Sequence, residues 1–210
     1  EEPVAEWADL GLRAVFVGLE ATTDPELDAM HKDTTVDANR RAIEVLRRHG
    51  VDVYGSLITQ PDYTRADWAR LKRFIDETQL YYLNVSPLTP LPGTRIWDQR
   101  QRETTVPRRA HALWDLSHVV LPTRMPLKQY YRSLLGVYLH ACLDPRRAAR
   151  LSLRTAPPIW SGKFLRLWMG ALKIAHQFLT AHRHHTARAL ARAADRGAPG
   201  ALAPLLAKQP

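Results

Sequence analysis

The sequence predicts an α/β fold in which parallel strands alternate with helices. The apolar run over residues 14–19, Ala-Val-Phe-Val-Gly-Leu, is typical of a parallel strand that is covered on both faces. A polar turn, an amphipathic helical segment and another apolar run follow it, and this unit then repeats. Strands that alternate with helices at this spacing indicate right-handed βαβ units.

Each element has its own sequence signal. A first helix is predicted over residues 2–10, before Gly11. The second helix is predicted over residues 36–49, with one apolar face and Gly50 as a stop signal, and the next strand over residues 51–59. A third helix, capped by Thr64, covers residues 65–78, and a third strand covers residues 81–88.

Glu20 follows the first strand directly, which places a carboxylate at the carboxyl end of that strand. Catalytic and binding residues of α/β barrels gather at this end. Glu20 is therefore the first candidate for a functional residue. The alternative is a carboxylate that caps a helix or forms a salt bridge.

Four sequence motifs together resemble a known family. They are Phe16-Val17-Gly18-Leu19-Glu20-Ala21, Met30-His31-Lys32 with Thr34-Thr35, Gly55-Ser56-Leu57-Ile58 with Pro61-Asp62, and residues 84–94, Asn-Val-Ser-Pro-Leu-Thr-Pro-Leu-Pro-Gly-Thr. Their order and spacing are similar to the second half of a radical S-adenosylmethionine barrel. The resemblance implies that residues 1–100 are the second half of a partial (βα)6 TIM-like barrel, beginning just before its fourth strand. Residues 101–196 would be a mainly helical extension, basic from about residue 145, and residues 197–210 a disordered tail.

The family binds S-adenosylmethionine against a [4Fe-4S] cluster that three cysteines hold. This sequence contains one cysteine, Cys142, so it cannot supply the three thiolates, and no metal ligand is assigned within it. The expectation is a carboxyl-terminal fragment that is inactive alone and needs the upstream half of its own barrel. A solitary cysteine also fits a reducing, cytoplasmic compartment.

The resemblance also implies roles for particular side chains. Glu20 would contact the ribose hydroxyls or the methionyl ammonium of S-adenosylmethionine, and Lys32 its carboxylate. Ser56 would contact the ribose, with Leu57 and Ile58 forming an apolar wall for adenine. Asn84 would share a common rim with Glu20 and Ser56. The alternatives are a solvated loop residue for Lys32, a packing residue for Ser56, and ordinary core for Leu57 and Ile58.

The pair Pro61-Asp62 and the region 107–140, which is expected to be helical, resemble the hopanoid C-3 methylases. These are cobalamin-dependent radical enzymes that methylate an unactivated carbon of a lipid. The resemblance implies cobalamin as a further cofactor, with its ligands outside this sequence. His118, Arg124, Tyr130 and Tyr131 are candidates for a substrate pocket, although helix surface and core are the preferred interpretation.

Two other function classes stay open. Another radical enzyme, such as an anaerobic porphyrin cyclase or a methylthiotransferase, would share the same barrel motifs. A basic nucleic-acid-binding module on a degenerate barrel is the non-enzymatic alternative. Few aromatic residues lie among the cations after Arg183, which disfavours binding of single-stranded nucleic acid.

The positive charge is concentrated in the last third of the chain. Residues 145–210 hold twelve Lys and Arg against one acid, a net charge of +11, and since the whole chain carries +9, residues 1–144 carry −2. A two-faced basic helix is predicted over residues 163–180, too short in its apolar runs to span a bilayer. Packing on its own protein is the preferred interpretation, and peripheral contact with the inner face of the membrane is the alternative. His182, His184 and His185 are interpreted as a solvated helix end rather than a metal site.

Overall fold

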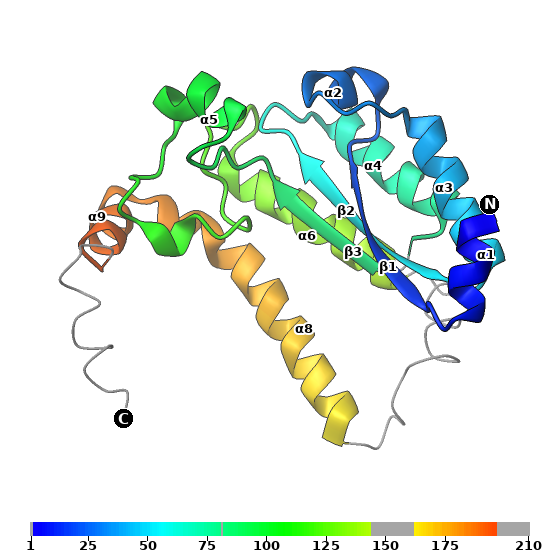
Figure 1. Ribbon diagram of the computed structural model, residues 1–210. Helices are drawn as coiled ribbons and strands as arrows, with labels where there is room; N and C mark the ends of the chain where they lie inside the picture. Colours follow the sequence, from blue (N-terminus) through cyan, green and yellow to red (C-terminus); the bar gives the residue numbers. More distant parts are fainter. Residues whose placement is uncertain (1, 81, 144–161, 197–210) are drawn as a thin grey trace, which may run out of the picture.

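Three parallel strands form the centre of the molecule (Figure 1). The computed structural model describes the backbone of residues 2–80, 82–143 and 162–196. Strands β1 (Ala14–Glu20), β2 (Asp52–Thr59) and β3 (Tyr82–Pro87) lie side by side in chain order. Each begins and ends within about two residues of the range that the sequence predicts, so the α/β class and the parallel pairing are confirmed.

Helices precede and follow every strand. Before β3 these are α1 (Glu2–Asp9), α2 (Asp24–Ala29), α3 (Val36–Arg48) and α4 (Arg65–Thr78). After β3 the longer helices are α6 (Leu127–Leu143) and α8 (Gly162–Thr180), with the shorter α5 (Arg95–Arg100) and α9 (Ala187–Arg196). Three 3₁₀ turns complete the described chain: η1 (Gln101–Glu103), η2 (His111–Leu113) and η3 (Ala181–His185).

Local capping explains where α3 and α4 begin. The Thr35 hydroxyl accepts the N–H of Ala38 at 3.1 Å, and the Asp67 carboxylate accepts the N–H of Thr64 at 2.7 Å. Each bond satisfies a backbone donor that the first helical turn leaves without a partner. Both helices therefore begin at defined points. Both also lie on the same face of the sheet.

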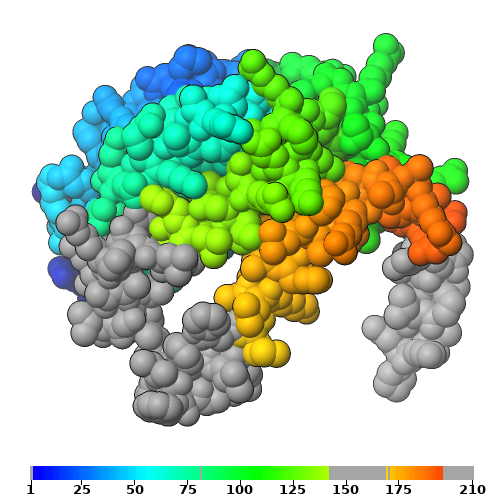
Figure 2. Space-filling view, turned by 180° about the vertical axis from the view of Figure 1, so that it is seen from behind, coloured from blue at the N-terminus to red at the C-terminus, as the bar shows by residue number. Residues whose placement is uncertain are grey.

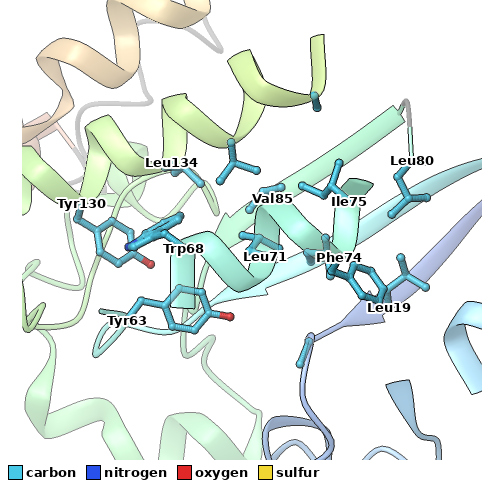
Figure 3. Packing of buried hydrophobic residues seen from close by; sticks show 14 of the residues in the cluster. Leu19, Tyr63, Trp68, Leu71, Phe74, Ile75, Leu80, Val85, Tyr130 and Leu134 are labelled. Atoms are coloured by element: carbon cyan, nitrogen blue, oxygen red, sulfur yellow. The ribbon is translucent and has the colours of Figure 1, made fainter. Parts of the chain in front are cut away.

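The core lies between that face of the sheet and helices α3, α4 and α6. Leu19, Leu57 and Val85 point into it from the three strands and pack with residues such as Leu71 and Phe74 of α4 (Figure 3). Seen from behind, α3, α4 and α6 together form the surface that covers the sheet (Figure 2). The opposite face of the sheet is open: Phe16 is 63% exposed and packs edge-on against Tyr54 at 5.3 Å between ring centres.

Helix α6 joins the extension to the sheet through a buried tyrosine. The Tyr130 hydroxyl lies 2.7 Å from the Thr59 hydroxyl, and Trp68 packs edge-on against the Tyr130 ring. Burial raises the pKa of Tyr130 well above its ordinary value, so the hydroxyl stays protonated and can donate. Tyr130 and Tyr131 are both fully buried, which agrees with the preferred interpretation of these residues as core.

The structure corrects the expectation that residues 107–140 are helical throughout. Between η1 and α6 the chain is irregular except for the turn η2, and α6 begins only at Leu127. Pro107, Pro122 and Pro126 lie in this stretch, and proline lacks the N–H that a helix interior needs. The segment instead folds around a second small core, in which Val106, Leu113 and Leu121 contact Leu190 of α9.

Three expectations fall wholly or partly on residues outside the described parts of the structure. The tail over residues 197–210 is one, and the side chain of Cys142 in α6 is another. Helix α8 itself spans Gly162–Thr180, close to the predicted range, but the side chains of its first turns are not described.

Candidate functional site

The open face of the sheet carries most of the candidate residues. Burial alternates along each strand, so that Val53, Gly55 and Leu57 of β2 face the helices while Tyr54 and Ser56 face outward. The parallel register places Gly18 beside Ser56, and Ser56 beside Asn84. These three residues form a row across the open face.

Glu20 lies at the carboxyl end of β1 and turns back over the same face. Its φ of 65° is left-handed, and the pairing with β2 shifts by one residue between Gly18 and Glu20. The buried side chain of Asn39 donates to the Leu19 carbonyl at 3.1 Å, which holds the strand end in place. A left-handed conformation costs a non-glycine residue about 1 kcal/mol, so it persists only where its surroundings determine it.

Gly18 makes the space that the Glu20 carboxylate occupies. A Cβ atom built on Gly18 would lie 2.5 Å from Glu20 Oε1, closer than any carbon can approach an oxygen without a shift. The position of the Glu20 carboxylate therefore depends on the absence of a side chain at Gly18. The Gly-Leu-Glu sequence places the carboxylate over the backbone of its own strand.

Lys32 meets Glu20 directly. Its Nζ donates to Glu20 Oε1 at 3.1 Å from the turn that follows α2, where His31 has a φ of 54°. The Lys32 side chain is more exposed than that of Glu20. The structure thus brings together two candidates that lie twelve residues apart in the sequence. A salt bridge was the alternative interpretation of Glu20, and the structure shows one, but the sequence did not identify Lys32 as its partner.

Ser56 and Asn84 also contact each other. Asn84 Nδ2 donates to Ser56 Oγ at 3.4 Å, and both side chains are half-buried. Ile58, two residues after Ser56, lies on the same face and is half-buried as well. The sequence predicts that Glu20, Ser56 and Asn84 lie along a common rim, and their role there stays a prediction. In the structure Ser56 pairs with Asn84 within the strands, and Glu20 pairs with Leu57, the residue after Ser56.

Leu57 does not belong to this group. It is 1% exposed and lies in the core beneath the sheet, because successive side chains of a strand point to opposite faces. The structure therefore places Leu57 in the ordinary core, which was the alternative interpretation of this residue. Of the two residues expected to form an apolar wall, only Ile58 faces outward.

The side chains of this group have the chemistry to contact a polar molecule. A carboxylate, an ammonium group, a hydroxyl and an amide lie on one face, next to the apolar side chains Phe16, Tyr54 and Ile58. Among the described residues, no group of three or more His, Cys, Asp or Glu side chains could hold a metal ion. The donor set fits a ligand that combines hydroxyl groups with both signs of charge.

The sequence analysis missed a second polar cluster, far from the sheet in sequence. The Asp115 carboxylate lies 3.0 Å from His118 Nδ1, and His118 Nε2 lies 2.8 Å from His184 Nδ1. His185 Nε2 lies 3.1 Å from the Tyr131 hydroxyl. Hydrogen bonds from His118 and the backbone outweigh desolvation and lower the pKa of Asp115 to about 2.

This cluster corrects the interpretation of the histidines as a solvated helix end for His185, whereas His184 is exposed. His185 is half-buried, and His184 contacts His118 across 66 residues of sequence. No local pattern could have shown such a contact, because it depends on how η3 packs against the loop before α6.

The chain is similar to parts of several known methylases. No family model matches it. The hopanoid C-3 methylase of Methylococcus capsulatus is 34% identical over 129 residues, which are 61% of this chain and 24% of that protein. The hopanoid C-2 methylase of Rhodopseudomonas palustris is 31% identical over 91 residues, 42% of this chain and 17% of the methylase. A predicted methylthiotransferase of Methanocaldococcus jannaschii is 35% identical over 85 residues, 40% of this chain and 19% of that protein.

The chain thus spans about a quarter of the C-3 methylase and less of the other two. These similarities agree with the resemblance to hopanoid C-3 methylases that the sequence motifs indicate. The relatives are named as enzymes that transfer methyl or methylthio groups.

Proposed function

We propose that residues 1–100 are the second half of a radical S-adenosylmethionine barrel, and that the open face of its sheet binds S-adenosylmethionine. Residues 101–196 would be an extension of that barrel. The observation that carries the proposal is the shared face of Glu20, Ser56 and Asn84, in a chain similar to hopanoid methylases.

The polar groups on the open face suit this ligand. The Glu20 carboxylate can accept hydrogen bonds from ribose hydroxyls or from the methionyl ammonium, and the Lys32 ammonium can pair with the methionyl carboxylate. The Ser56 hydroxyl and the Asn84 amide both donate and accept, as a ribose requires. Ile58, with the exposed rings of Phe16 and Tyr54, offers apolar contact to the adenine.

The other two cofactors would be held elsewhere. One cysteine in the sequence cannot bind a [4Fe-4S] cluster, so the cluster would be held by residues outside this chain, and the same applies to cobalamin. When bound, these groups together with S-adenosylmethionine would supply the radical chemistry and the methyl group. The role of this chain is to hold S-adenosylmethionine in place at the open face.

A hopanoid-like lipid is the substrate class that the comparisons favour. The match to the C-3 methylase covers 129 residues, so at least 29 of them lie outside residues 1–100. The matches to the C-2 methylase and the methylthiotransferase, over 91 and 85 residues, are short enough for residues 1–100 alone to contain them. The similarity to the C-3 methylase therefore extends beyond the barrel into the extension. This supports methylation at C-3 of a hopanoid more than a function that shares only the barrel.

Methylthio transfer is the second candidate, because one relative carries that name. Product analysis separates the two functions. The full-length protein, reconstituted with its cofactors, is incubated with a hopanoid and with S-adenosylmethionine whose methyl group is trideuterated. The proposed function predicts a hopanoid heavier by one deuterated methyl group, on a carbon of ring A.

An unmodified hopanoid, together with a methylthiolated product in a parallel assay of methylthiotransferase substrates, would contradict hopanoid methylation. The Glu20→Gln variant provides the internal control. It should reduce turnover at a subsaturating concentration of S-adenosylmethionine by about tenfold, the effect of losing one charge-assisted interaction.

A further inference from the structure

Helix α8 presents large apolar side chains to solvent. Met169, Leu172 and Leu179 are 62%, 57% and 46% exposed. Their spacing of three and seven residues places them on one side of the helix, and we name these three residues the α8 stripe. Ile174 is also exposed, but at 100° per residue it lies about 160° from Leu172, on another side.

The helix is attached to the rest of the molecule near its carboxyl end. Phe178 stacks on Tyr138 of α6 with 5.6 Å between ring centres, and Ala181 is buried in the main core. From there α8 extends away from the sheet (Figure 1) and projects from the body formed by α4 and α6 (Figure 2). Packing among the residues that the structure describes therefore leaves the α8 stripe uncovered.

The surroundings of the α8 stripe are strongly basic. Residues 162–196 contain seven Lys and Arg and one acid, Asp195. Four of these cations have described side chains and are exposed: Lys173, Arg183, Arg188 and Arg192. Lys173 lies one helical turn after Met169, at the border of the stripe. An apolar stripe with Lys173 at its border, followed by exposed cations on η3 and α9, complements a surface that is apolar inside and anionic outside.

Nucleic acid and an anionic bilayer surface could both attract these cations, and the exposed apolar side chains distinguish between them. Nucleic acid would pair with the cations but would leave Met169, Leu172 and Leu179 in water. Stacking on bases would need free aromatic rings, and Phe178, the aromatic residue of α8 whose side chain the structure describes, is already stacked on Tyr138. A bilayer surface satisfies both features, because acyl chains take up the stripe and headgroups pair with the cations.

We propose that the α8 stripe docks on an anionic phospholipid bilayer, with α8 lying in the plane of the interface. No helix within the described ranges is long and apolar enough to cross a membrane, which agrees with an orientation along the surface. This proposal goes beyond the proposed function and depends only on the surface of α8, η3 and α9, so it holds for any substrate.

Vesicle flotation of the full-length protein tests the proposal without any catalytic readout. The protein should float with vesicles of equal parts phosphatidylcholine and phosphatidylglycerol, and far less with phosphatidylcholine alone. Raising the salt concentration should weaken the binding, because headgroup charges are screened. The Leu172→Glu variant should bind about tenfold more weakly, since it removes one apolar contact and adds a like charge.

The matched control is Leu10→Glu, an apolar-to-acid change at a residue that is 86% exposed and follows α1. It should bind vesicles as the unaltered protein does. Lys173→Glu provides a second variant on the helix surface, should Leu172→Glu lose its fold by circular dichroism. Equal binding of the folded Leu172→Glu or Lys173→Glu variant and the Leu10→Glu control would overturn the proposal. So would DNA binding without vesicle binding, or a change from oligomer to monomer in Leu172→Glu without vesicle binding.

Discussion

At the scale of single residues, Glu20 is the centre of the candidate site. Its left-handed backbone directs the carboxylate over Gly18, and Lys32 pairs with it at 3.1 Å. The hydrogen bond from Asn39 to the Leu19 carbonyl is buried and fixes the same turn. The left-handed conformation of Glu20 therefore persists because its surroundings determine it.

The pairing of Gly18 with Glu20 gives the first residue-scale prediction. Gly18→Ala adds a methyl group 2.5 Å from Glu20 Oε1, so the carboxylate must move from its position beside Lys32. Loss of one charge-assisted hydrogen bond corresponds to about 1.5–3 kcal/mol, so the Kd for S-adenosylmethionine should rise about tenfold or more. Equilibrium binding to the full-length protein measures this.

The control is Gly136→Ala in α6, where an added methyl group meets nothing closer than Lys72 Nζ at 3.5 Å. It should leave the affinity unchanged. An unaltered Kd in Gly18→Ala would show that the position of the carboxylate does not matter for binding.

At the scale of elements, the cluster around His185 joins η3 to the loop before α6. Burial and the neighbouring imidazoles His118, His184 and His182 lower the pKa of His185 to about 4. The Tyr131 hydroxyl accepts the N–H of Val119 and contacts His185 Nε2 at 3.1 Å, and Asp115 is the acidic group on the far side of His118. Burial and the neighbouring imidazoles thus favour a neutral His185 at this contact.

This geometry predicts a pH-dependent stability. The ordinary pKa of histidine is about 6.5, so between about pH 6.5 and 4 the unfolded chain binds a proton that the folded chain excludes. The stability that His185 contributes is complete above about pH 6.5 and is lost as the pH falls through about 4. Thermal unfolding of the full-length protein followed from pH 7.5 to 4.5 should show a falling midpoint.

His185→Gln keeps an acceptor for the Tyr131 hydroxyl but does not titrate, so its midpoint should fall less over the same range. His176→Gln, at an exposed position of α8, serves as the control and should follow the unaltered protein. Parallel pH curves for His185→Gln and the unaltered protein would contradict this account of the cluster.

The sequence predicted the three strands and the helices between them because each has a local signal, such as the run at residues 14–19 or the Thr64 cap. It also predicted that Glu20, Ser56 and Asn84 come from three successive parallel strands, which the structure shows. It could not predict the pairing of Glu20 with Lys32 or of His118 with His184. Such contacts depend on the packing of distant segments.

The region 107–126 shows a different limit. Its apolar residues suggested helices, but they serve a small core around Leu113 and Leu121 that needs no helical period. Pro107 and Pro122 were visible in the sequence and could have corrected the expectation.

At the scale of the whole molecule, the described structure has one covered and one open sheet face. Helices α3, α4 and α6 cover the first, whereas Phe16 and Tyr54 on the second are exposed. The chain spans 24% of the C-3 methylase, so the open face lies in only a part of what such a protein contains. The candidate ligand site and the α8 stripe lie in different parts of the fold, and each can be tested while the other is left intact.

The most direct test is a calorimetric titration of the full-length protein with S-adenosylmethionine, compared between the unaltered protein and Glu20→Gln. The control is Glu44→Gln in α3, whose carboxylate pairs with Arg48 on the solvent side of that helix. A site on the open face predicts that Glu20→Gln weakens binding about tenfold while Glu44→Gln has no effect. Equal affinity in all three proteins would show that S-adenosylmethionine does not bind at Glu20.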